Sequence, residues 1–239
     1  MKIRKSGNIV TTLLTMFLLV SCFSDNTKTE LEVYTDAYTV KKMVGGEAVY
    51  AVAFYAYGNQ MMNSGNVTEI GGSGVQINLG INPGSIFTLW KWPSVSDFKP
   101  YPPSAADYKF VITAESGMNN ESLDHLNPKN LAIPVIAKTE LSENNKLINV
   151  TWTSVTGANG FLIKVSEESG NIIYSSDGML PTVTSNTINI LTGNWTKPVE
   201  PGKTYIIEVH AFAYEAGTDA LYKAYNVEEI SIGQKSVTL

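Results

Sequence analysis

The feature that most constrains the fold of this chain is a two-residue period of apolar side chains that begins near Leu31. Successive side chains of a β-strand point to opposite faces, so this period predicts strands with one buried face. No segment shows a convincing helical period, and turn-forming segments such as 71–74 and 82–84 separate the alternating runs. The sequence therefore predicts an all-β fold. The clearest alternating runs cover 49–57, 75–79, 108–114, 148–152, 161–165 and 205–211.

The length of 239 residues allows one or two domains. A polar segment that is poor in β-forming residues lies near the middle of the chain, and such segments are typical of domain junctions. We therefore expect an N-terminal β-sandwich over 31–118, a linker over 119–130 and a second β-sandwich over 131–239.

The N-terminus has the pattern of a secretory signal. Basic residues lie within the first five positions, and a short apolar run over 13–20 ends at Ser21 and Cys22. A run of this length is shorter than a membrane-spanning helix. The small residue followed directly by cysteine resembles the bacterial lipoprotein signal. That resemblance implies removal of residues 1–21, lipid attachment at Cys22 and a tether over 22–30.

Two further features bear on where such a protein would be placed. Phe23, rather than Asp, follows the cysteine, which resembles signals for export to the outer membrane. The acidic tether is similar to the export tethers of Bacteroidota lipoproteins. The resemblance implies an outer-membrane protein held by its N-terminal lipid, and the side of the membrane that it faces stays open, with surface display as one alternative. Cys22 is the only cysteine, so no disulfide can form within one chain.

The charge pattern argues against nucleic-acid partners. Removing residues 1–21 takes three of the 17 basic residues and none of the 22 acidic ones, which leaves a net charge of about −8. It also takes Arg4, the only arginine. Nucleic-acid binding relies on basic side chains that neutralise phosphates, and arginine is the residue best suited to gripping them.

The second half resembles a fibronectin type III domain. The segment 147–152 ends in Trp152, which matches the buried tryptophan of the second strand, and 157–161 matches the turn into the third. The segment 201–205 ends in Tyr205, at the place of the tyrosine corner. The resemblance covers 131–239 and implies an immunoglobulin-like sandwich.

Catalytic patterns are weak, so we expect no enzyme, no cofactor and no metal site. The two histidines are His125, in the predicted linker, and His210, which alternates with apolar residues and is expected to point away from the core. A metal site needs several convergent ligands, and a nucleophilic serine needs a base with an orienting group. Adjacent carboxylates such as Glu167 and Glu168 would point to opposite faces of a strand.

Aromatic side chains give the remaining candidates for a binding site. Trp90 and Trp92 share one face if they lie in a strand, Tyr101 follows shortly, and Trp195 lies in a predicted loop. Flat aromatic side chains on a sandwich can stack on sugar rings. The alternatives are that Trp90 and Trp92 fill the core and that Trp195 closes one end of the sandwich.

The sequence therefore predicts a non-catalytic, lipid-anchored binding or accessory protein of the cell envelope. Its expected ligand is a polysaccharide or a neighbouring surface protein. The alternative is a structural fimbrial or adhesin subunit. Fimbrial subunits that are matured by an arginine-specific protease need an arginine beyond the tether, and this chain has none there. A glycoside hydrolase is the least favoured reading, since no carboxylate pair can be identified from the sequence.

Mass spectrometry of the protein purified from its native membrane tests the anchor. We expect an N-terminus at Cys22 that carries acyl chains, because the pattern resembles a processed lipoprotein signal. A product that retains residues 1–21 and has no acyl adduct would contradict the lipoprotein prediction.

Overall fold

The structure is a computed structural model that describes residues 29–143, 146–217 and 226–239. The predicted leader over 1–21, Cys22 and nearly all of the tether lie outside these residues. Residues 31–239 form one compact unit. This unit is built almost entirely of strands, with a single short 3₁₀ helix among the described residues, so the predicted all-β class is confirmed.

The strands fall into two β-sandwiches, as predicted. The N-terminal sandwich holds β1(Val33–Val44), β2(Glu47–Gly58), β3(Met62–Glu69), β4(Gln76–Asn82), β5(Ser85–Lys91), the 3₁₀ helix η1(Val95–Asp97), β6(Ala106–Ala114) and β7(Asn119–Leu126). The C-terminal sandwich holds β8(Ile136–Ser142), β9(Leu147–Trp152), β10(Gly160–Glu167), β11(Ile172–Ser175), β12(Ser185–Asn189), β13(Thr204–Tyr214) and β14(Val227–Thr238).

The C-terminal sandwich has the strand arrangement of a fibronectin type III or immunoglobulin-like domain. The three-stranded sheet β12-β9-β8 packs against β11-β10-β13-β14 over a shared apolar core. Trp152 is buried in this core, with its ring centroid 5.6 Å from that of Phe161. The hydroxyl of Tyr205 accepts a hydrogen bond of 2.8 Å from the backbone N–H of Glu200. Both predicted signatures, the buried tryptophan and the tyrosine corner, are therefore present.

The N-terminal sandwich closes through side chains that join its last strand to its first. Asp124 of β7 accepts a hydrogen bond from the backbone N–H of Ala37 at 2.7 Å. The Oγ of Ser122 lies 2.9 Å from the Oγ1 of Thr35, also on β1. The sheet thus curls back on itself around a core that includes Phe54, Phe110 and Leu126.

The same strand corrects the predicted linker over 119–130. Residues 119–126 are β7, paired antiparallel with β6 from Asn119 to Leu126, and only the last part of the predicted segment lies outside a strand. The segment looked like a linker because its inward side chains before Leu126, among them Ser122 and Asp124, are polar. These side chains bond to β1 and do not enter an apolar core.

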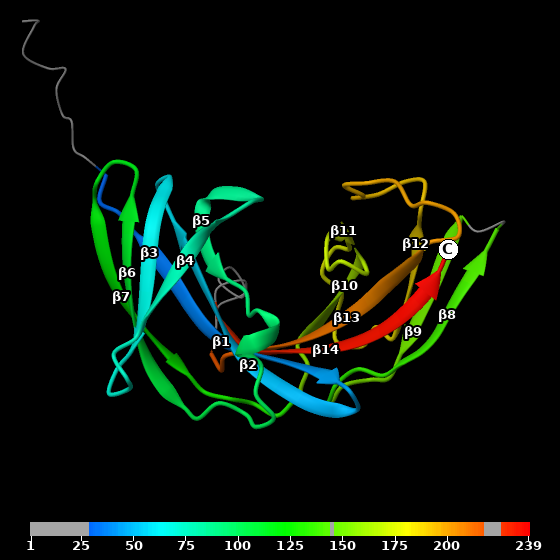
Figure 1. Ribbon diagram of the computed structural model, residues 1–239, viewed down its shortest axis with the longest axis horizontal. Helices are drawn as coiled ribbons and strands as arrows, with labels where there is room; N and C mark the ends of the chain where they lie inside the picture. Colours follow the sequence, from blue (N-terminus) through cyan, green and yellow to red (C-terminus); the bar gives the residue numbers. More distant parts are fainter. Residues whose placement is uncertain (1–28, 144–145, 218–225) are drawn as a thin grey trace, which may run out of the picture. The chain divides into compact units, whose positions relative to one another are not determined.

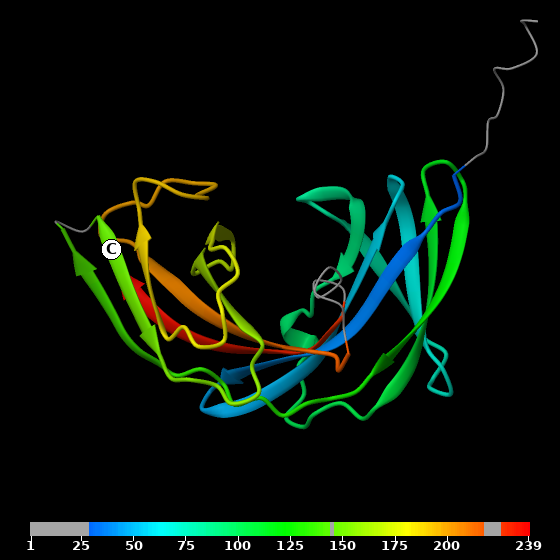
Figure 2. The ribbon, with the colours of Figure 1, turned by 180° about the vertical axis from the view of Figure 1, so that it is seen from behind.

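A parallel pairing of β1 with β14 joins the two sandwiches. The register runs from Thr39 opposite Glu229 to Lys42 opposite Ile232. It makes a single eleven-stranded sheet with the order β11-β10-β13-β14-β1-β2-β5-β4-β3-β6-β7. Figures 1 and 2 show blue β1 and red β14 side by side from opposite directions. The two halves therefore share a backbone hydrogen-bond ladder.

The connection from β7 to β8 packs against this junction. The buried Lys41 of β1 donates from Nζ to the carbonyl of Leu131 at 2.7 Å and to Oδ1 of Asn130 at 2.8 Å. At Gly233 of β14, an added Cβ would overlap with the carbonyl of Pro134. The connection therefore lies so close to β14 that only glycine fits there.

Replacing Gly233 with alanine tests this packing. We expect Gly233→Ala to lower the free energy of unfolding by about 2 kcal/mol or more, because the new methyl group displaces the backbone of Pro134. Gly80→Ala is the matched control, since a Cβ at that strand glycine meets only the carbonyl oxygen of Trp90, at 3.9 Å. Urea unfolding of both variants measures the difference, and equal stabilities would contradict the close approach.

Candidate functional site: a groove on the shared sheet

A groove of about 420 Å³ lies on the face of the shared sheet that points away from the C-terminal core. On β13, Ile207 and Val209 enter that core, so the alternating Glu208 and His210 point to the opposite side. Residues from both sandwiches line the groove because β1 continues the sheet beyond β14. The lining residues are Val40, Lys42, Trp90, Trp92, Phe98, Lys164, Ser166, Gly170, Ile172, Ile206, Glu208, His210, Ile232 and Gln234.

A row of polar side chains crosses three neighbouring strands of this groove. Lys164 of β10 pairs with Glu208 of β13, which pairs in turn with Gln234 of β14. Glu208 accepts a hydrogen bond of 2.6 Å from Nε2 of Gln234, and its other oxygen lies 2.8 Å from Nε2 of His210. Both carboxylate oxygens of Glu208 are therefore engaged by neighbouring side chains.

His210 points away from the core, as predicted, yet it is 1% exposed. Burial lowers the pKa of His210; the hydrogen bond with Glu208 opposes this shift, and the positive charge of Lys164 adds to it. The imidazole is therefore neutral near pH 7. In the tautomer that carries its proton on Nε2, it donates that proton to Glu208.

Glu208 is held as a carboxylate. Burial by itself would raise its pKa, but the hydrogen bond and charge of His210, the hydrogen bond from Gln234 and the charge of Lys164 outweigh burial and lower the pKa to about 2. The side chain is only 17% exposed, so these contacts act with little screening by water.

Two lysines face the groove without a hydrogen bond or an ion pair within the described part of the chain. Nζ of Lys164 lies 5.5 Å from the ring centroid of Trp92, and Nζ of Lys42 lies 4.2 Å from that of Phe98. Burial lowers the pKa of Lys164, and the negative charge of Glu208 partly offsets the shift. The ring faces stabilise both ammonium groups only in part.

Trp90 and Trp92 both line this groove, so the predicted shared face is confirmed. Trp90 ends the pairing of β5 with β2 opposite Tyr55, and Trp92 follows that strand. Trp92 also packs against the apolar cluster at the junction of the sandwiches, whereas Trp90 belongs to none of the three apolar clusters of the described residues. Both rings are half-buried. Trp90 is therefore the tryptophan of this pair that can be replaced without removing a side chain from an apolar cluster.

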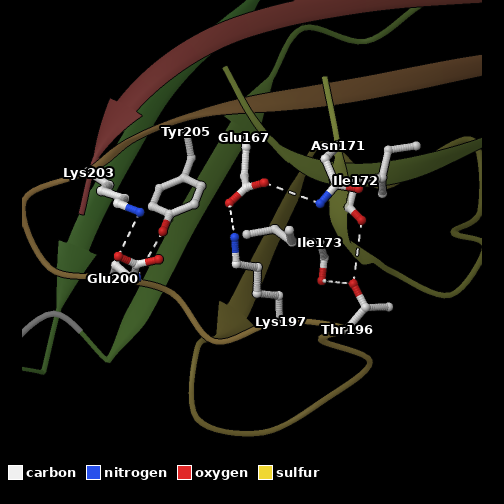
Figure 3. Close-up of polar contacts among 9 residues, drawn as sticks. All are labelled: Glu167, Asn171, Ile172, Ile173, Thr196, Lys197, Glu200, Lys203 and Tyr205. Carbon is white, nitrogen blue, oxygen red and sulfur yellow. Dashed lines mark hydrogen bonds and ion pairs between the residues drawn. The ribbon is translucent and has the colours of Figure 1, made fainter. Parts of the chain in front are cut away.

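Trp195 lies elsewhere and closes one end of the C-terminal sandwich. Its ring packs on Tyr174 with a centroid distance of 4.7 Å, and its Nε1 donates to the carbonyl of Asn189 at 2.9 Å. In the same loop, Thr196 donates its backbone N–H to the carbonyl of Ile173 at 2.9 Å. Figure 3 shows this loop held against the β10–β11 hairpin, with Lys197 paired to Glu167. The arrangement fits a structural plug.

The remaining predicted positions are not part of the groove. Tyr101 is 64% exposed and does not line it. His125 lies on β7, where Nδ1 contacts Oδ1 of Asp107 at 2.7 Å. No group of three or more potential metal ligands is found among the described residues. The same residues include no helix that is both long and apolar enough to cross a membrane.

Sequence reasoning missed the polar row of Lys164, Glu208 and Gln234. The available signal was their alternation with core residues on three strands, but alternating polar positions usually face water. That these positions face a groove depends on the β1–β14 pairing, which joins segments far apart in the chain.

The pKa of Glu208 gives a testable pH dependence. Because its folded value of about 2 lies below the unfolded value of 4.5, its contribution to stability is full above pH 4.5 and is lost as the pH falls through 2. Glu208→Gln should therefore be roughly 2–3 kcal/mol less stable than wild type above pH 4.5, with the gap closing near pH 2. Urea unfolding across this range measures it, with exposed Glu47→Gln as control. A gap independent of pH would contradict the assignment.

No protein-family model matches the chain, and no curated protein sequence matches it significantly. Among solved structures, a two-domain fibronectin type III segment of chicken tenascin matches with a TM-score of 0.26 and 10% identity, over 88% of this chain and 98% of that one. The BSP domain of a biofilm-associated protein matches with a TM-score of 0.25 and 16% identity, over 87% of this chain and 29% of that one.

A cytokine receptor complex matches with a TM-score of 0.25 and 10% identity, over 85% of this chain and 100% of that one. At such TM-scores these likenesses carry no argument about function. The fibronectin type III-like architecture stands on the strand order, the buried Trp152 and the Tyr205 corner of the chain itself.

Proposed function

We propose that this chain is a non-catalytic, lipid-anchored protein of the cell envelope that binds polysaccharide in the groove of its shared sheet. The observation that carries the proposal is that Trp90 and Trp92 line one groove together with side chains able to hydrogen-bond. The lipid at Cys22 and placement in the outer membrane rest on the sequence pattern alone.

The chemistry of the groove supports a sugar ligand. A volume of about 420 Å³ lies within the usual range of ligand sites. The C–H faces of a sugar ring pack on flat aromatic side chains, and its hydroxyls need nearby donors and acceptors. Trp90 and Trp92 supply the aromatic faces, and Ser166, Lys164 and Gln234 supply hydrogen-bonding groups.

The described residues that line the groove do not supply the paired carboxylates of a glycoside hydrolase. Most glycosidases use two carboxylates that flank the scissile bond. Glu208 is the one carboxylate among the described lining residues, and both of its oxygens are already engaged. This arrangement supports binding without catalysis. The alternatives, a surface-protein ligand or a fimbrial subunit, have no comparable feature among the described residues to support them.

Affinity electrophoresis of the mature protein on a panel of polysaccharides tests the proposal. We expect retention by at least one glycan. Trp90→Ala should weaken it about tenfold, because tryptophans that become covered by a ligand contribute strongly to binding. Trp195→Ala is the matched control, since Trp195 packs in a loop outside the groove. Absence of retention on every glycan, or equal loss in both variants, would reject this groove as the site.

A further inference from the structure

The groove holds more positive than negative free charge. Lys164 and Lys42 have no hydrogen bond or ion pair within the described residues; each ammonium lies over an aromatic ring, and the charge of Glu208 adds an attraction to Lys164. Lys164 and Lys42 both line the groove. Both side chains are half-buried. An ammonium in such a position gains from an anionic partner more than one on an open surface does.

Glu208, the carboxylate in the groove, does not act as the hydrogen-bonded anionic partner of Lys164 or Lys42. Glu208 lies directly opposite Lys164 in the strand register, yet both of its oxygens receive hydrogen bonds from other residues. His210 is neutral, so it adds no charge to the site. The lining residues thus carry two cations and one carboxylate, in a mature chain whose net charge is about −8.

We infer that the groove selects an acidic polysaccharide, whose sugar carboxylates pair with Lys164 and Lys42 while its rings pack on Trp90 and Trp92. This inference rests on the proposed function and names the class of glycan. A sugar acid carries a flat apolar ring face and a carboxylate on the same unit. The groove offers aromatic rings and free ammonium groups within the same 420 Å³. The contact of Lys164 with Trp92 places the two kinds of group side by side.

Because the chain carries a net negative charge, a preference for acidic glycans would point to local contacts in the groove. Long-range repulsion opposes the approach of an acidic polymer, so binding depends on short-range contacts in the groove. Removing the Lys164 charge should therefore cost more for an acidic glycan than for a neutral one. An ammonium–carboxylate hydrogen bond is among the stronger polar contacts, and its loss corresponds to about tenfold or more in affinity.

The experiment compares acidic polysaccharides with their uncharged esters. Polygalacturonate and alginate are each paired with the esterified form of the same polymer, and the dissociation constants of wild type, Lys164→Met, Lys164→Arg and Lys138→Met are measured. Methionine keeps the apolar stem of Lys164, and arginine keeps the charge. Lys138→Met is the matched control, because that lysine is exposed on β8 and paired with Glu140.

We expect wild type to prefer the acidic forms by about tenfold or more, Lys164→Met to lose most of this preference, and Lys164→Arg to retain most of it. Lys138→Met should behave as wild type. Equal binding of acidic and esterified forms, or an unchanged preference in Lys164→Met, would overturn the inference and leave the proposed function standing. Binding of neither form of any polymer would overturn both. Circular dichroism of each variant confirms that it is folded.

Discussion

The pairing of β1 with β14 is the interaction on which the rest of this structure depends. Each sandwich has its own apolar core, but the sheet continues from one to the other through a parallel ladder between Thr39–Lys42 and Glu229–Ile232. An outward-facing strand surface would normally meet water. Here the outward face of β13 and β14 becomes the floor of a groove, because β1 and the segment with Trp90 and Trp92 extend the surface beside it. The burial of His210 follows from this placement.

Burial on that face explains how a polar row can persist there. A buried charge is costly unless hydrogen bonds replace its lost water, and removing one partner of such a pair costs about 3–5 kcal/mol. Glu208 meets this requirement through His210 and Gln234, which leaves Lys164 as the less satisfied member of the row. Near pH 7 the histidine is neutral, so it donates to the carboxylate of Glu208 without adding a further charge to the groove. The groove therefore carries a hydrogen-bonded carboxylate, Glu208, and an ammonium, Lys164, that lies over the ring of Trp92.

The sequence predicted much of the fold, and the misses have a common cause. The alternation of apolar residues located the central parts of strands β2, β6, β9, β10 and β13. Two single residues, Trp152 and Tyr205, identified the C-terminal architecture. Alternation failed for β7, whose inward Ser122 and Asp124 bond to β1 instead of filling a core. For the site, spacing predicted that Trp90 and Trp92 share a face. It could not predict their polar neighbours, because a parallel contact between the first and last strands leaves no local signal in either one.

The close fit of Gly233 against Pro134 and the shared ladder determine whether the two sandwiches can be separated. Sandwiches of this type can move between proteins as separate modules when flexible linkers join them. Separating the two sandwiches at the β1–β14 ladder would here uncover Ile232, which packs in one apolar cluster with Val40 and Trp92. Residues 31–239 therefore act as one structural unit, because dividing them would expose apolar side chains that the two sandwiches bury together.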